Sequence, residues 1–234
     1  VGREQRAVRF HRIHRRFSEY TMIPQEIYVD NLVLAERVAG LRGCVVECGV
    51  WRGGMSAGLA TVLGPERDYF LFDSFEGLPP AKRIDGEAAL KWQSDYASPA
   101  YFDNCTAPVS FARRAMELSG VTSFQLVEGW FDDTLVGFVP QEPIVLLRLD
   151  GDWYDSTMTC LEALFDYVIP DGLIVVDDYH IWDGCSRAVH DFLSRRSAVE
   201  RIEGLGNICF VKKRPQINVE KSAAGKTQSN GLPA

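Results

Sequence analysis

The sequence predicts an α/β fold in which a mostly parallel sheet carries helices on both faces. Short apolar runs of strand length alternate along the chain with longer segments of helical periodicity. A glycine-rich turn follows the first of these strands, and acidic residues end several of the others. This alternation gives right-handed βαβ units, so ligands are expected beyond the carboxyl ends of the strands.

The expected elements follow from the spacing of apolar residues. Five buried strands are predicted, at residues 44–48, 69–73, 123–128, 144–150 and 173–177. Helices are predicted between them, including residues 55–63, 110–118 and 156–167. A late pair of runs, 199–203 and 208–212, flanks the turn at 204–207 and indicates a hairpin. We therefore expect a seven-stranded sheet that ends with an antiparallel strand.

Length and composition indicate one main domain. The chain has 234 residues, of which 46% are hydrophobic, enough for one sizeable core. We expect an N-terminal helical extension at residues 1–40 and the main domain at 41–214. Residues 215–234 are polar and aperiodic, and disorder is expected there. Residues 76–104 are rich in Pro, Gly, Asp and aromatics and interrupt the alternation, which predicts a lid-like insertion.

Charge and hydropathy restrict the partners. The net charge of -7 argues against a nucleic-acid-binding protein, which needs a basic surface. The basic stretch at 3–16 mixes Arg with Val, Phe and Ile and reads as an amphipathic helix. No apolar run approaches the ~18 residues of a membrane span, and no signal-peptide pattern opens the chain. A cytoplasmic protein is expected. The six cysteines lack a CxxC pair, which argues against zinc and a disulfide framework.

The residues of the glycine-rich turn indicate which cofactor the protein binds. A dinucleotide fingerprint needs G-x-G-x-x-G, but here Trp51 stands between Gly49 and Gly53 and would crowd a pyrophosphate. S-adenosylmethionine has no phosphate, and requires room beside the turn and a carboxylate for its ammonium group. Glu47, late in the first strand, is a candidate for that carboxylate.

The end of the second strand supports the same cofactor. Asp73 ends this strand, where an acidic residue receives the ribose hydroxyls of adenosyl cofactors. Together with Trp51, Gly53 and Ser74 it completes the predicted cofactor site. As the alternative interpretation, Asp73 is a turn or helix-capping residue.

Carboxylates at two later strand ends predict a metal site. Asp150 ends one strand, and Asp177 and Asp178 end the next, so all three should converge on one crevice. Carboxylates that lie so close repel one another unless a cation holds them, and oxygen ligands suit Mg²⁺ or another divalent ion. Asp150 is also expected beside the cofactor. Asp152 is the first candidate for a general base and His180 the second. These acids could instead cap the helices that follow.

Two functions of other classes fit parts of the pattern. The DGD sequence at 150–152 is similar to the D-x-D motif of metal-dependent glycosyltransferases, but that function leaves Asp73 and the glycine turn unexplained. A non-catalytic adenosyl-binding module would not need clustered carboxylates, which are destabilising. An NAD-dependent dehydrogenase is disfavoured by Trp51.

The sequence resembles the macrocin O-methyltransferase family. The resemblance rests on six blocks in the family's order: TM (21–22), ECGVWRGG (47–54), DSFEGLP (73–79), EGWFDDTL (128–135), LRLDGDWYDST (147–157) and VVDDY (175–179). It implies a Rossmann-like class I methyltransferase fold and metal-dependent methylation of a hydroxyl in a natural product, often on a deoxysugar.

The resemblance also assigns residues to roles. Glu47, Gly49 and Asp73 match cofactor positions, and Thr21 and Met22 are implied to enter the cofactor site from the N-terminal segment. Asp150, Asp177 and Asp178 match the metal-binding positions. The expected partner is a small hydroxyl acceptor that contains a sugar, while the exact acceptor and a homo-oligomeric state stay open. The stretch 82–104 has no counterpart in the resemblance.

Overall fold

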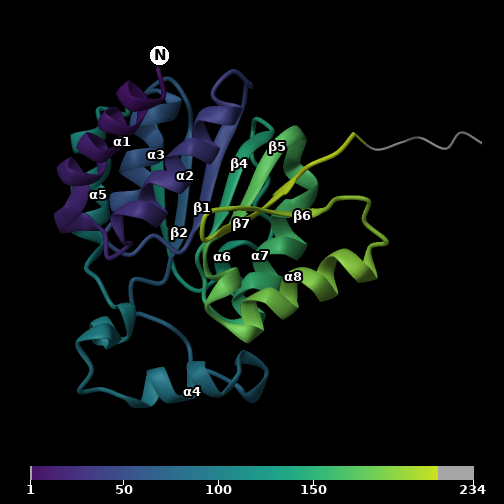
Figure 1. Cartoon of the computed structure of the whole chain (residues 1–234). Coiled ribbons are helices and arrows are strands. Elements are labelled where there is room, and N and C mark those ends of the chain that lie inside the picture. The colour runs from purple at the N-terminus through teal and green to yellow at the C-terminus, as the bar shows by residue number, and fades with distance from the viewer. Residues whose placement is uncertain (1, 216–234) are drawn as a thin grey trace, which may run out of the picture.

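The computed structural model describes residues 2–215 and contains one mixed sheet. Seven strands run in the order β3-β2-β1-β4-β5-β7-β6, in which the first five are parallel and β7 is antiparallel to β5 (Figure 1). This confirms the predicted fold class. The strands are β1 (Cys44–Cys48), β2 (Tyr69–Asp73), β3 (Phe124–Glu128), β4 (Ile144–Leu149), β5 (Val168–Val176), β6 (Ile202–Leu205) and β7 (Ile208–Lys212).

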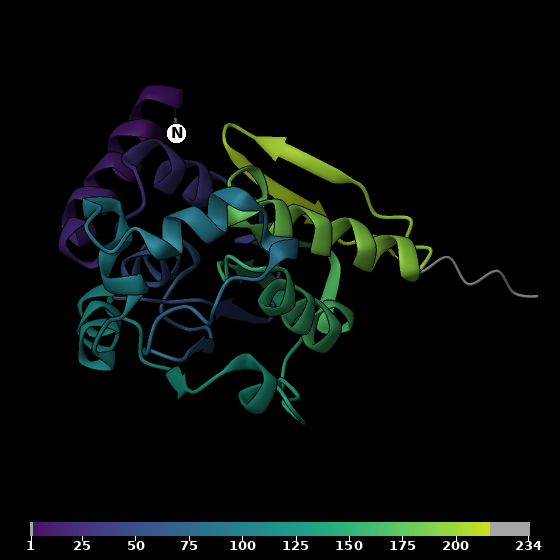
Figure 2. The same cartoon turned by 90° about the horizontal axis from the view of Figure 1, so that it is seen from below.

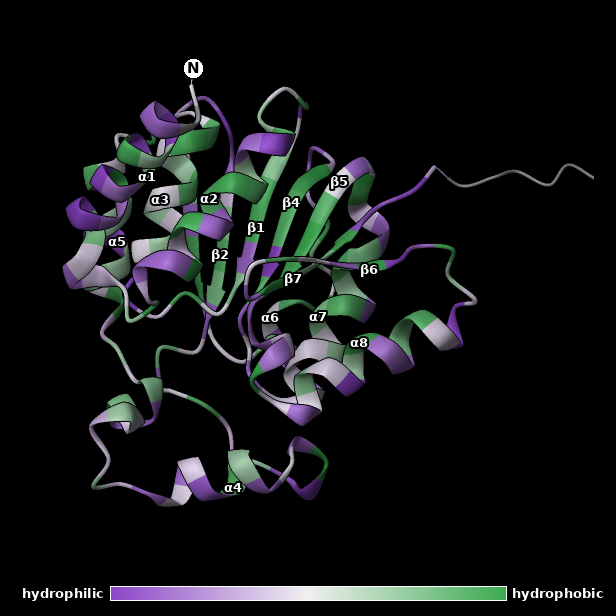
Figure 3. Ribbon diagram, in the orientation of Figure 1, coloured by the Kyte–Doolittle hydropathy of each residue, from purple (hydrophilic) through white to green (hydrophobic). Residues whose placement is uncertain are grey.

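The strands form where apolar runs are longest. Every residue of β1 and β4 is buried, because these central strands are covered on both faces. Figure 3 shows the sheet as largely hydrophobic. Two strand boundaries differ from the prediction by three residues or more. β5 begins five residues earlier, at Val168, since the turn residues Pro170 to Gly172 only interrupt its register. β6 begins at Ile202 rather than at residue 199.

Helices cover both faces of the sheet. The first layer holds α1 (Arg3–Phe17), α2 (Gln25–Val38), α3 (Gly54–Leu63) and α5 (Val109–Ser119), and the opposite layer holds α6 (Phe131–Thr134), α7 (Tyr154–Leu164) and α8 (Asp183–Arg195). Two hydrophobic cores lie between these layers and the sheet. None of the helices in the described part of the chain is long and apolar enough to cross a membrane.

The N-terminal helices pack against the helix that follows the glycine turn. The Tyr28 hydroxyl of α2 donates a hydrogen bond to the Gly54 carbonyl at 2.8 Å. A Cβ atom on Gly58 of α3 would lie 2.1 Å from the Tyr28 hydroxyl oxygen, so only glycine permits this approach. The segment between α1 and α2 is thereby held against the start of α3, beside the carboxyl end of β1.

Residues 76–104, the predicted lid, are ordered and partly helical. They contain α4 (Glu87–Ser94), which the sequence analysis did not predict, between the short 3-10 helices η2 (Arg83–Asp85) and η3 (Pro99–Cys105). The segment lies beyond the carboxyl ends of the parallel strands (Figures 1 and 2). It is anchored by Asp85, 2% exposed, whose Oδ1 accepts a hydrogen bond from the Tyr154 backbone N–H at 2.7 Å. The predicted disordered tail lies, apart from Pro215, outside the described residues.

Candidate active site

A cavity of about 650 Å³ opens at the carboxyl ends of β1, β2, β4 and β5. This is the edge at which ligands bind in open α/β sheets. The predicted site residues that line it are Thr21, Met22, Gly49, Trp51, Asp73, Ser74, Asp150, Asp152, Asp177 and Asp178. Residues of the lid, among them Leu78, Trp92 and Phe102, form the opposite wall.

The glycine turn is shaped by close approaches of backbone. Gly49 has a φ of 90°, and a Cβ atom there would lie 1.9 Å from the Asp150 carbonyl oxygen, so glycine lets the ends of β1 and β4 meet. Gly53 has a φ of 80° and precedes α3, where a Cβ atom would lie 2.7 Å from the Ala112 Cα. Gly53 shapes the turn but is not among the residues that line the cavity.

Trp51 occupies the turn in an unusual conformation. Its φ of 49° lies in the left-handed region, which is rare for a large side chain. Its ring lines the cavity and contacts Phe102 of the lid edge to face. The indole N–H is buried and has no hydrogen-bond partner in the described protein, which leaves one donor for a bound ligand.

Asp73 ties the second strand to the glycine turn. Its Oδ2 accepts hydrogen bonds from the backbone N–H groups of Val50 at 2.6 Å and Trp51 at 2.8 Å, and its Oδ1 accepts one from Phe75 at 2.7 Å. Burial raises the pKa of this carboxyl group, while these three bonds oppose the rise. Asp73 therefore shapes the turn and also faces the cavity. Neighbouring Ser74 donates to the Gly77 carbonyl at 3.0 Å.

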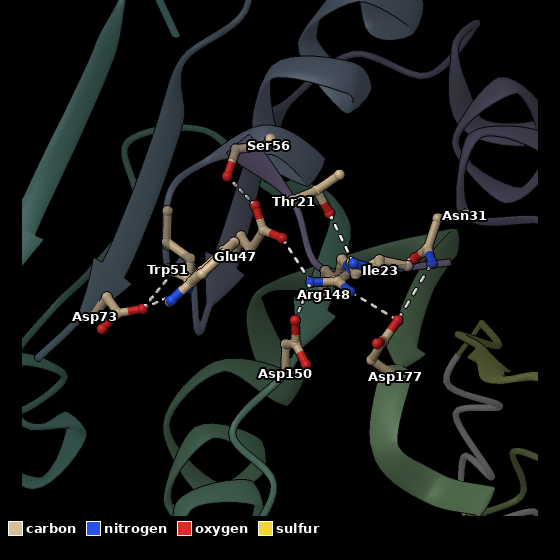
Figure 4. A network of polar contacts seen from close by, with 12 residues as sticks. Thr21, Ile23, Asn31, Glu47, Trp51, Ser56, Asp73, Arg148, Asp150 and Asp177 are labelled. Atoms are coloured by element: carbon tan, nitrogen blue, oxygen red, sulfur yellow. Dashed lines mark hydrogen bonds and ion pairs between the residues drawn. The ribbon is translucent and has the colours of Figure 1, made fainter. Parts of the chain in front are cut away.

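Glu47 has a different environment from the one predicted. Its side chain is 1% exposed and does not line the cavity. One carboxylate oxygen accepts a hydrogen bond from the Ser56 hydroxyl, and the other pairs with Arg148 at 2.7 Å (Figure 4). A direct contact with the ammonium group of a cofactor is not supported by this position, because both oxygens are already engaged beneath the cavity floor.

Arg148 is the functional residue that the sequence analysis missed. It lies inside the buried strand β4 with a side chain that is 1% exposed, and its guanidinium pairs with Glu47, with Asp150 at 2.8 Å and with Asp177 at 2.7 Å. The contact with Asp177 is an ion pair without hydrogen-bond geometry. An arginine within an otherwise apolar strand was the available signal, because a buried charge requires partners.

The three predicted metal ligands do converge. Asp150, Asp177 and Asp178 each offer an oxygen, and these oxygens lie within 4.8 Å of one another. Arg148 reaches the first two and not Asp178. Part of the positive charge that such close carboxylates require is therefore supplied by the protein itself, through the Arg148 guanidinium.

The remaining charge still fits a divalent ion. Burial, together with repulsion from Asp152, Asp150 and Asp177, raises the pKa of Asp178 well above its ordinary value. Of the five carboxyl groups gathered here, Glu47, Asp150 and Asp177 pair with the guanidinium, whereas Asp152 and Asp178 form no ion pair with it in the described structure. Oxygen donors with surplus negative charge are the ligands that Mg²⁺ and similar ions prefer.

Asp152, the first candidate base, is held in a defined orientation. It follows β4 with a φ of 58°, and its Oδ1 accepts a hydrogen bond from the Trp182 indole N–H at 2.9 Å. Burial and the nearby charge of Asp150 raise its pKa well above the ordinary value. His180, the second candidate, is exposed and is not among the residues that line the cavity. Its position does not support a role as base.

The fold is the Rossmann-like fold of class I methyltransferases, with a cavity at the carboxyl ends of its parallel strands. The chain belongs to the macrocin-O-methyltransferase (TylF) family, whose model matches residues 9–213, and it is accordingly an O-methyltransferase. This membership gives no support to the glycosyltransferase or the non-catalytic binding module considered above.

Named relatives agree with this assignment, and a solved structure agrees with the fold. The chain is 35% identical over 192 residues to a Streptomyces olivaceus 8-demethyl-8-(2,3-dimethoxy-alpha-L-rhamnosyl)-tetracenomycin-C 4'-O-methyltransferase, covering 76% of this chain and 69% of that one. It is 32% identical to the mycinamicin III 3''-O-methyltransferase of Micromonospora griseorubida, over 70% of this chain and 65% of that one. The O-methyltransferase NovP has a similar fold, with a TM-score of 0.70, 24% identity and coverage of 84% and 83%.

Proposed function

We propose that this chain transfers a methyl group from S-adenosylmethionine to a sugar hydroxyl of a glycosylated natural product, with the help of a divalent ion. The observation that carries the proposal is one cavity with two halves. The ends of β1 and β2 supply an apolar and hydrogen-bonding half, and the ends of β4 and β5 supply a carboxylate half. The relatives support the acceptor class, because one of them is named for a rhamnosyl-bearing substrate.

The first half suits an adenosyl cofactor. The Trp51 indole offers an apolar wall and an unpaired donor, and Asp73 offers carboxylate oxygens that can accept further hydrogen bonds from ribose hydroxyls. Thr21 and Met22 close the cavity from the N-terminal segment. No phosphate needs to approach the turn, so the bulk of Trp51 is tolerated.

The second half suits an acceptor hydroxyl. A divalent ion, when bound by Asp150, Asp177 and Asp178, would supply a positive charge that lowers the pKa of a sugar hydroxyl. Lid residues such as Trp92 would pack against the apolar face of the sugar or of the group that carries it. Closure of the lid would exclude water from the cavity.

Asp152 would accept the proton. As the acceptor oxygen attacks the methyl carbon, the C–O bond forms, the C–S bond breaks with its electron pair left on sulfur, and the hydroxyl proton passes to the carboxylate. The raised pKa of Asp152 makes it a stronger base than an exposed aspartate. Its hydrogen bond from Trp182 fixes one oxygen and leaves the other for this proton.

Calorimetry and methyl transfer test this assignment. S-adenosylmethionine should bind the purified protein, and Asp73→Asn should weaken binding by roughly 1.5 to 3 kcal/mol through the lost charge-assisted bonds. Transfer of a labelled methyl group should be seen with a rhamnosylated acceptor and not with its aglycone. Equal transfer to the aglycone would contradict the sugar assignment, and unchanged affinity of folded Asp73→Asn would remove Asp73 from the cofactor site.

A further inference from the structure

We propose that Arg148 and Asn31 are positioning residues, which orient Asp150 and Asp177 so that one oxygen of each stays free to ligate a divalent ion. This inference rests on the proposed function. It assigns a role to a helix of the N-terminal extension, because Asn31 lies on α2, far in sequence from the strand ends. The five residues Asn31, Glu47, Arg148, Asp150 and Asp177 are called the Arg148 network below (Figure 4).

The contacts within the network each engage one particular oxygen of the two carboxylates. Arg148 pairs with Oδ2 of Asp150 at 2.8 Å and with Oδ1 of Asp177 at 2.7 Å. Asn31 Nδ2 donates to that same Oδ1 of Asp177 at 3.2 Å. Each carboxylate therefore has one oxygen engaged by the network, and its second oxygen remains available on the cavity side. Partners of this kind fix the orientation of metal ligands in other proteins.

Asn31 and Glu47 in turn fix the guanidinium. Asn31 Oδ1 accepts a hydrogen bond from Arg148 Nε at 3.1 Å, and its amide nitrogen also donates to the Ile27 carbonyl at 3.1 Å. Glu47 pairs with Arg148 on the opposite side, at 2.7 Å. Asn31 is 1% exposed, so both polar ends of a buried amide serve this network. A buried amide without hydrogen-bond partners would destabilise the fold.

The test measures metal binding directly. Metal-stripped full-length protein is titrated with MgCl₂ alone by calorimetry, as wild type and as Asn31→Leu. This substitution keeps the approximate volume and removes the hydrogen bonds of Asn31 with Arg148 and Asp177. We expect Mg²⁺ affinity to fall about 10- to 100-fold, as for other residues that orient metal ligands. S-Adenosylmethionine affinity should change less than about twofold, because Asn31 does not line the cavity. Saturating Mg²⁺ should restore kcat in the variant.

A core substitution on the same helix provides the control. Leu32→Ala removes a fully buried side chain of α2 and should destabilise the fold while leaving Mg²⁺ affinity unchanged.

Arg148→Lys should lose less Mg²⁺ affinity than Arg148→Met, because it keeps the charge. Wild-type Mg²⁺ affinity in folded Asn31→Leu would overturn the positioning role alone. Absence of Mg²⁺ binding by the wild type would overturn the proposed ion together with it.

Discussion

Trp182 holds the carboxylate of Asp152 in place, and its ring is held in turn by two other tryptophans. Trp182 packs against Trp153 at a centroid distance of 5.3 Å and against Trp92 of the lid at 5.9 Å. Trp153 donates to the Pro79 carbonyl of the lid at 2.8 Å. The candidate base is therefore linked through aromatic packing to the segment that covers it.

Trp182→Phe should slow turnover without weakening cofactor binding. The substitution keeps an aromatic ring but removes the hydrogen bond to Asp152, so the carboxylate loses its orientation. We expect kcat to fall about tenfold or more, the effect of one hydrogen bond to a charged group, with KM for S-adenosylmethionine unchanged. Steady-state kinetics measures both parameters.

Two comparisons isolate this effect. Tyr154→Phe is the control, because it removes a side-chain hydrogen bond, to Asp191 at 3.0 Å, from a residue that does not line the cavity. In an Asp152→Asn background, Trp182→Phe should cost far less than it does alone. Full activity of Trp182→Phe, or an equal loss in both backgrounds, would show that Asp152 does not depend on this bond.

At the scale of elements, the lid is anchored at one end and exposed in the middle. Asp85 binds the backbone of Tyr154 at the start of α7 and that of Lys82 at 2.7 Å, and Lys82 forms an ion pair with Asp155. Residues 94–97, by contrast, are exposed. Opening should therefore involve the part of the lid that follows α4 more than the part that precedes it.

Limited proteolysis tests this arrangement. Subtilisin should cut wild-type protein first at residues 94–97, and cofactor with acceptor should slow the cut. Asp85→Ala leaves the buried Tyr154 N–H unsatisfied, at a cost of about 1 to 3 kcal/mol, and should make the cutting faster. The control is Glu87→Ala, at an exposed position of the same segment that lies outside residues 94–97. Equal rates for Asp85→Ala and wild type would show that Asp85 does not anchor the lid.

The sequence predicted the elements best where a single local pattern decides them. Apolar runs located β1 and β2 to the residue, because strands that are covered on both faces read as short, nearly continuous apolar runs. α4 was missed, because a helix of eight residues between Pro- and Gly-rich stretches carries little periodicity. Arg148 was missed for another reason: its partners come from β1, from α2 and from the residue that follows β5, and no local pattern reports contacts between distant segments.

At the scale of the whole molecule, buried acidic groups make stability depend on pH. Burial raises the pKa of Glu47 from 4.5 to about 7, although Arg148 opposes the rise. Burial and neighbouring carboxylates also raise the pKa values of Asp152, Asp177 and Asp178. A raised pKa means that the folded state binds more protons than the unfolded state, so the free energy of unfolding falls as pH rises.

Thermal unfolding should show this dependence and its reversal by a divalent ion. For Glu47 the free energy of unfolding falls between pH 4.5 and about pH 7, and the total decrease is about 3 kcal/mol. Metal-stripped protein should therefore have a lower Tm at pH 7 than at pH 5. Mg²⁺ should raise Tm more at pH 7, since its ligands must be deprotonated. If Mg²⁺ raised Tm equally at the two pH values, or more at pH 5, ligation by carboxylates would be contradicted.

The central claim is that a divalent ion held by Asp150, Asp177 and Asp178 serves methyl transfer and not cofactor binding. The most direct measurement is single-turnover methyl transfer by metal-stripped protein at saturating S-adenosylmethionine and acceptor, before and after addition of Mg²⁺. The account predicts negligible transfer without the ion, recovery with it, and the same cofactor affinity in both states, whereas Asp177→Asn should not recover. Full transfer in the metal-stripped protein would contradict the claim and would leave Arg148 as the cation that the carboxylates require.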